Sequence, residues 1–171
     1  MVAGFSGTSK VQLTAELRGS GPGVVPLFTL APLLDKTKTV PGSGAVGTGN
    51  LLYSGSEIID GSGHEDLNLI GVLDSPFGDP LSFAELTQIF IKADIDNEGD
   101  LVIGAASSHP FNGPLGTAGT WTLRPGEFLF WESAKGWPVT AAVSDNLRIS
   151  NSDEADAGCQ VRIVGRSVGA A

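Results

Sequence analysis

The sequence predicts an all-β protein, an antiparallel β-sandwich or jelly roll of about ten short strands. Apolar and polar residues alternate over many short segments, as they do in strands with one buried face. Clusters rich in Gly, Pro, Asn and Asp separate these segments at nearly regular spacing, which is typical of turns. No strand pattern is followed by a long helical one, and this disfavours a parallel sheet.

Strict alternation begins at residues 10–18. One face of this strand would carry the apolar residues Val11, Leu13, Ala15 and Leu17. A turn is expected at residues 19–23, and an apolar run follows at 24–30. Residues 35–50 are rich in Gly and have little to bury, so the sequence predicts a long exposed loop there.

The same two signals continue to the C-terminal end. Strands are expected at 51–54, 57–60, 66–72, 89–95, 101–105, 121–123, 127–131, 138–143, 147–150 and 160–164. One short helix is predicted near residues 82–88, because Ser82 followed by Glu85 matches the capping box that begins many helices.

The chain is short enough for one main domain. With 171 residues it can bury a sufficient core without a staple, and the single Cys159 cannot form an internal disulfide. We expect an N-terminal arm over residues 1–8, with Phe5 as its apolar anchor, and a single β-sandwich domain over residues 9–171.

Charge and composition exclude several function classes. The 19 acidic and 10 basic residues give a net charge of −9, which disfavours nonspecific binding of nucleic acid. The N-terminus lacks the pattern of a signal peptide, and no apolar stretch is long enough for a membrane span, so neither is expected. Charged residues make up only 17% of the chain. A surface with so few charges is expected where other subunits cover it. A β-rich domain with many turns would explain the same composition.

An acidic segment at 94–100 resembles the start of a calcium-binding loop. Its candidate ligands are Asp94, Asp96, Glu98 and Asp100. The residue that should close such a loop with a bidentate carboxylate is Ala105, and strands flank the segment. A solvated hairpin turn explains the same residues, so we expect no metal and no cofactor.

No catalytic group of residues can be defended from the sequence. His64, Glu65 and Asp66 could form an acid–base pair or part of a metal site, but His109 is the one other histidine in the chain. No nucleophile elbow of the Gly-x-Ser-x-Gly type occurs. Cys159 opens a predicted strand and is expected to be a small core residue.

Aromatic residues gather around residues 128–137. In the predicted strand 127–131, Phe128 and Phe130 fall on one face and Leu129 and Trp131 on the other. A strand that is apolar on both faces is either central in a sandwich or covered by a neighbouring subunit. The candidate partner-binding residues are therefore Phe5, Trp131 and Trp137, with core packing as the alternative for the tryptophans.

Several segments together carry a family resemblance over roughly residues 50–167. They are Glu65–Asp74, Phe77-Gly78, Leu81–Leu86, Ile89–Ala93, Gly104–Phe111, Arg124-Pro125-Gly126, Gly136–Thr140 and Asp145–Ser152. In these segments the chain resembles small β-rich structural proteins of tailed bacteriophages. The motifs are those of a fold type and are not catalytic signatures.

The resemblance implies a non-enzymatic virion protein, made in the host cytoplasm. Capsid decoration (cement) proteins are its first implication: they bind and stabilise the outer face of a phage head, often as trimers. The implied partners are the major capsid protein or other virion proteins and further copies of the chain, with no nucleic acid and no membrane. The alternatives are a tail or head-fibre component, or a carbohydrate- or host-surface-binding module on the same fold.

Overall fold

A computed structural model describes residues 7–17, 28–40 and 49–167 of the chain. These residues form twelve strands and no helix, which confirms the all-β class. All pairings between the strands are antiparallel. The strands are β1 (Gly7–Leu17), β2 (Phe28–Val40), β3 (Leu51–Ile59), β4 (His64–Asn68), β5 (Ile70–Asp74), β6 (Pro80–Ser82), β7 (Glu85–Ala93), β8 (Leu101–Gly104), β9 (Thr120–Leu123), β10 (Phe128–Pro138), β11 (Asn146–Asn151) and β12 (Ala157–Arg166).

The chain divides into two compact units instead of the one domain expected over residues 9–171. One unit is Ser6–Val40, and the other comprises Met1–Phe5 and Pro41–Ala171. The expected arm at residues 1–8 ends inside β1, where Gly7 and Thr8 already pair with β2. The arm's remaining residues, with Phe5, lie outside the described residues.

The smaller unit is a hairpin in which β1 pairs with β2. The loop predicted at 35–50 is therefore wrong for residues 35–40, which pair with residues 7–12. The register shifts where residues 31–33 of β2 stand opposite the single residue Thr14. Pro32 lies in this bulge, because proline cannot donate a hydrogen bond to a regular ladder.

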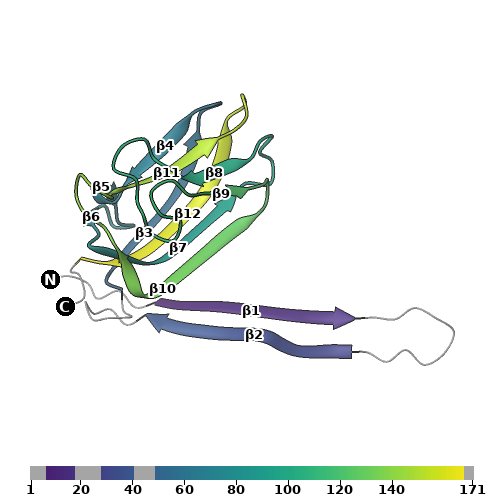
Figure 1. Cartoon of the computed structure of the whole chain (residues 1–171). Helices are drawn as coiled ribbons and strands as arrows, with labels where there is room; N and C mark the ends of the chain where they lie inside the picture. Colours follow the sequence, from purple (N-terminus) through teal and green to yellow (C-terminus); the bar gives the residue numbers. More distant parts are fainter. Residues whose placement is uncertain (1–6, 18–27, 41–48, 168–171) are drawn as a thin grey trace. The chain divides into compact units, whose positions relative to one another are not determined.

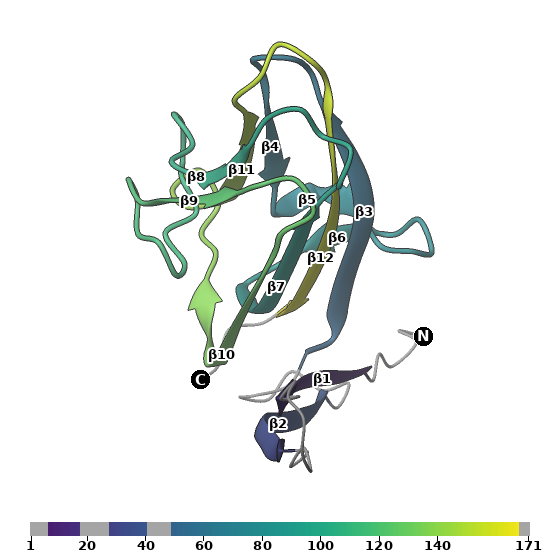
Figure 2. The same ribbon diagram turned by 90° about the vertical axis from the view of Figure 1, so that its right-hand side faces the viewer.

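The larger unit is a β-sandwich of two four-stranded sheets. The strand order is β10-β7-β12-β3 in one sheet and β4-β11-β8-β9 in the other, and β5 pairs with β6 beside them. Figures 1 and 2 show the two four-stranded sheets as separate layers. This confirms the predicted sandwich, whereas the jelly-roll variant is not confirmed.

The core lies between these layers and is built from alternating residues. The central strands contribute alternate side chains to it along most of their length, and this buried apolar surface is the main stabilising contribution to such a fold. The core residues of the central strands with no exposed surface are Leu86, Ile89, Ile91, Ala93, Leu101, Ile103, Ile149, Val161 and Ile163.

The helix predicted near residues 82–88 is wrong. Ser82 ends β6, and Glu85 begins β7, a strand that is paired on both sides. Between them, the Ala84 amide donates to the Arg166 carbonyl at 2.7 Å. The capping box is a local preference, and the tertiary pairing of β7 with two neighbours outweighs it.

The strand expected at 138–143 is also wrong beyond its first residue. The Thr140 carbonyl accepts hydrogen bonds from the amides of Val143 and Ser144, at 3.1 and 2.9 Å. Residues 139–143 therefore turn instead of extending β10.

A buried ion pair joins three strands at one end of the first sheet. Arg166 on β12 is fully buried, forms a salt bridge with Glu85 on β7 and donates to the carbonyl of Lys135 on β10. Burial lowers the pKa of Arg166. A Cβ at Gly136 would lie 2.8 Å from a guanidinium nitrogen, so glycine is needed for β10 to pass over the pair.

We expect Arg166→Met to destabilise the protein by about 3 kcal/mol, because it leaves the Glu85 carboxylate buried without its cation. The free energy of unfolding in urea measures this. Arg166→Met with Glu85→Leu should recover part of the loss. Arg162→Met on the same strand is the matched control, and its half-exposed guanidinium should cost less than about 1 kcal/mol. Equal losses in the two single variants would contradict the assignment.

Candidate functional site

Strand β10 is apolar on both faces, as the sequence predicts. Leu129 is buried and Trp131 is half-buried against the core. Phe128 and Phe130 fall on the other face, and Phe128 is 63% exposed. Because β10 is an edge strand of its sheet, the explanation that it lies centrally in a sandwich does not apply.

A third phenylalanine joins these two on the outer face of the sheet. Phe90 on β7 is directly opposite Phe130, and its ring centroid lies 5.8 Å from that of Phe128. We call Phe90, Phe128 and Phe130 the phenylalanine patch. The register places Lys92 beside Phe128 and Arg162 beside Phe90, so cations flank the patch.

The patch departs from the usual pattern of a sandwich. The outer face of an antiparallel sheet is ordinarily polar, since it meets water. Three contiguous aromatic side chains on two neighbouring strands form an apolar surface of the kind that other molecules cover. Phe90 escaped the sequence analysis because its pairing with β10 joins segments about forty residues apart.

The predicted partner-binding tryptophans have a different position. Trp131 and Trp137 are both partly buried and pack against the core cluster. This is the core-packing alternative that the sequence left open. Phe5 lies outside the described residues, so its role stays a prediction.

The acidic segment 94–100 is a connection that packs against a second acidic loop. The side-chain amide of Asn97 accepts from the Gly158 amide at 2.8 Å and donates to the Gly158 carbonyl at 3.0 Å. The Asp100 amide donates to the Ser152 hydroxyl at 3.0 Å. Asn97 and the backbone thus account for the segment's geometry.

A buried asparagine holds the second acidic loop. The Asn151 side-chain amide donates to the Ala155 carbonyl at 2.7 Å, and its oxygen accepts from the Asp153 amide at 3.0 Å. Gly61 joins the same end of the sandwich, since its amide donates to Asp156. The loops 60–63, 94–100 and 151–156 therefore lie together at this end of the sandwich and are joined by hydrogen bonds of amide groups.

The carboxylates at this end are spread over the loops. Among the residues that the structure describes, no three His, Cys, Asp or Glu side chains gather closely enough to hold an ion. The calcium candidates Asp94, Asp96, Glu98 and Asp100 all lie in that part of the chain and are not brought together.

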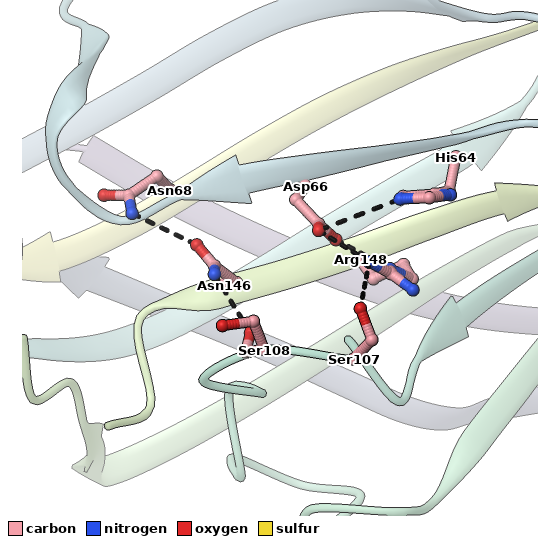
Figure 3. A network of polar contacts seen from close by, with 7 residues as sticks. All are labelled: His64, Asp66, Asn68, Ser107, Ser108, Asn146 and Arg148. Atoms are coloured by element: carbon pink, nitrogen blue, oxygen red, sulfur yellow. Dashed lines mark hydrogen bonds and ion pairs between the residues drawn. The ribbon is translucent and has the colours of Figure 1, made fainter. Parts of the chain in front are cut away.

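The histidine candidates lie on separate polar networks. Asp66 on β4 accepts two hydrogen bonds from Arg148 on β11, both at 2.7 Å, and Figure 3 shows His64 beside them. The closest approach of His64 to Asp66 is 4.0 Å. The hydrogen bonds from Arg148 hold the pKa of Asp66 below its ordinary value. Asp66 is thus committed to Arg148 and is a poor proton acceptor.

His109 pairs with a different carboxylate. Its Nδ1 lies 3.6 Å from Oδ1 of the buried Asp145, whose other oxygen accepts from the Ala142 amide. A further chain of amides runs nearby, from Asn68 through Asn146 to the Ser108 carbonyl (Figure 3). The two histidines therefore do not share a partner.

Cys159 is a core residue, as expected. It is buried between the sheets, and burial together with Glu57 and Asp94 raises its pKa to about 12. A thiol with this pKa is almost entirely protonated at neutral pH and is a poor nucleophile.

A shallow pocket lies where β10 leaves the sandwich. Its volume is about 220 Å³, and its lining includes Trp137, Thr140, Ser144 and Asn112. One aromatic ring beside hydroxyl and amide groups can bind a small polar ligand with an apolar face.

Comparison with family models, with curated proteins and with solved structures finds no match to this chain. In the described part of the chain, no helix has the length and hydropathy that a membrane crossing requires. The function is therefore argued from the residues themselves.

We expect Arg148→Met to destabilise the protein by about 1 kcal/mol at neutral pH, because a bidentate arginine–carboxylate pair is lost. The folded pKa of Asp66 is lowered, so this stabilisation is present above the unfolded pKa, near 4, and is lost as the pH falls through the folded value. Unfolding free energies of both proteins, measured against pH, test this.

The exposed Arg124 supplies the control for this pair. Arg124→Met removes the same charge and should change stability by less than the Arg148 variant at neutral pH. A difference between wild type and Arg148→Met that persists unchanged in acid would contradict the role given to Asp66.

Proposed function

We propose that the chain is a non-enzymatic structural protein of a virus particle, and specifically a capsid decoration protein on the outer face of a phage head. The phenylalanine patch carries this proposal, since it is an apolar contact surface on the outside of an otherwise complete sandwich. The low charge content and the resemblance to β-rich virion proteins support the same reading.

The proposal includes no enzymatic activity. The candidate catalytic groups have other roles. Asp66 binds Arg148, and the Cys159 thiol is buried and protonated. His64 and His109 each face a carboxylate of a different network. A nucleophile, a base and a group that orients the base would have to meet for catalysis.

The proposed partners are the major capsid protein or other virion proteins, together with further copies of the chain, a trimer being favoured. The protein would be made in the host cytoplasm and act in the virion. A tail or head-fibre component is the alternative within this class. Copy number separates the two, because a decorated shell holds far more copies than a tail or a vertex.

We expect Phe128→Ser to weaken attachment to purified phage particles that lack the protein by about tenfold or more, since a central aromatic contact is lost. Cosedimentation with the particles over a range of concentrations measures this. Phe77→Ser is the matched control, because Phe77 is 87% exposed and lies away from the patch, between β5 and β6. Equal attachment of both variants, or no attachment of the wild type, would overturn the proposal.

The second candidate function is a carbohydrate- or host-surface-binding module. The pocket beside Trp137 favours it, because sugars stack an apolar face on an aromatic ring and bond their hydroxyls to groups such as those of Asn112 and Thr140. This function would use a different surface from the phenylalanine patch.

If the pocket binds sugars, Asn112→Ala and Thr140→Val should each reduce binding on a glycan array by about fivefold or more, because each removes one polar contact. Both residues are exposed, so the fold should be retained. Thr122→Val, on β9, is the matched control. Absence of glycan binding by the wild-type protein would exclude this function.

A further inference from the structure

The hairpin β1–β2 is too small to be stable alone. It forms a compact unit of its own, Ser6–Val40, and has two strands. An isolated two-stranded hairpin is at best marginally stable in water, because it has too little apolar surface to bury. A surface that packs against it is therefore required.

The register shows which side of the hairpin would be covered. Residues directly opposite in an antiparallel pair share a face, and so do alternate residues along a strand. One face carries the pairs Leu13–Leu34, Ala15–Leu30 and Leu17–Phe28. The other face carries the pairs Lys10–Thr37, Gln12–Asp35 and Glu16–Thr29. The hairpin is therefore amphipathic, with one apolar face.

The two units of the chain also differ in the sign of their charge. Residues 6–40 contain four basic and two acidic residues, a net charge of +2. The total of −9 leaves −11 for the rest of the chain. Oppositely charged surfaces favour association and fix its orientation.

Charges also border the apolar face of the hairpin and the phenylalanine patch, which has cations beside it on β7 and β12 and carboxylates beyond the end of β7. On the hairpin, the apolar pairs are followed along the same face by Lys36 and then Lys38. On the sandwich, the patch is followed at the end of β7 by the exposed carboxylates Asp94 and Asp96. Each surface thus has an apolar part, and beyond it the hairpin carries lysines while the sandwich, past Lys92, carries carboxylates.

We propose that the apolar face of the hairpin packs on the phenylalanine patch of a second copy of this chain, with Lys36 and Lys38 next to that copy's acidic segment 94–100. The contact joins two different surfaces, so it can close either as a dimer that exchanges hairpins or as a head-to-tail ring such as a trimer. The inference rests on the proposed function in one respect, that the patch is a protein-contact surface, and it names the occupant.

Cross-linking between two differently tagged chains tests the contact. One chain carries Lys36→Cys and the other Asp96→Cys, and a short bismaleimide should join them into a mixed dimer. Native Cys159 is buried and protonated, so it should not react. Thr37→Cys, on the opposite hairpin face, is the control and should join less. A chain with both substitutions that cross-links within a monomer would overturn the proposal in favour of packing on its own sandwich.

Sedimentation equilibrium tests the same contact without cysteines. The wild type should form a concentration-dependent oligomer, which Leu34→Glu and Phe128→Ser should each weaken by about tenfold or more. Thr37→Glu adds the same charge to the polar face, and Phe77→Ser removes the same ring elsewhere, so both should leave the oligomer unchanged. Circular dichroism checks that each variant is folded. A wild type that stays monomeric at high micromolar concentration would overturn the proposal.

The outcomes separate this inference from the proposed function. A monomeric wild type whose particle attachment is lost in Phe128→Ser means that the shell, and not a second copy, covers the patch. An oligomer that both test variants disrupt, in a protein that never binds particles, supports the second copy as occupant and rejects the decoration role.

Discussion

The structure of the sandwich depends on one constraint, the double pairing of β7. This strand is hydrogen-bonded to β10 on one side and β12 on the other, while its inner residues Ile89 and Ile91 are fully buried. Slipping either neighbour by one residue would turn a complete set of apolar side chains to the wrong face. The register of β10, and with it the placement of Phe128 and Phe130 on the outer face, follows from this pairing.

Polar side chains hold strands and loops in place at the two ends of the sandwich, beyond the apolar core. At one end the buried Arg166 joins three strands, where a backbone ladder alone would leave β10 free to splay. At the other end, Asn97 and Asn151 bind backbone groups of neighbouring loops. Amides serve this purpose well because they both donate and accept. Carboxylates of the same loops also accept hydrogen bonds from backbone amides, as Asp156 does from Gly61.

Charged side chains hold neighbouring strands of the sandwich together. Asp66 on β4, for example, accepts two hydrogen bonds from Arg148 on β11. The structure also has an apolar patch on one sheet of the sandwich and, in a separate unit, a hairpin with one apolar face. Under the function proposed above these surfaces contact other proteins, and the opposite net charges of the two units would orient that contact.

The sequence by itself determined the all-β class, the inward and outward faces of residues 127–131, and the buried position of Cys159. The first two follow from alternation with a period of two, and the third follows from the usual role of a lone cysteine at the start of a strand; both are local properties of the chain. Only the tertiary structure decided that β10 is an edge strand, that Glu85 begins a strand instead of a helix, and that residues 35–40 pair with β1. Strand order and register depend on pairing between segments far apart in sequence. The local secondary-structure propensities of a segment do not determine which other segment it pairs with.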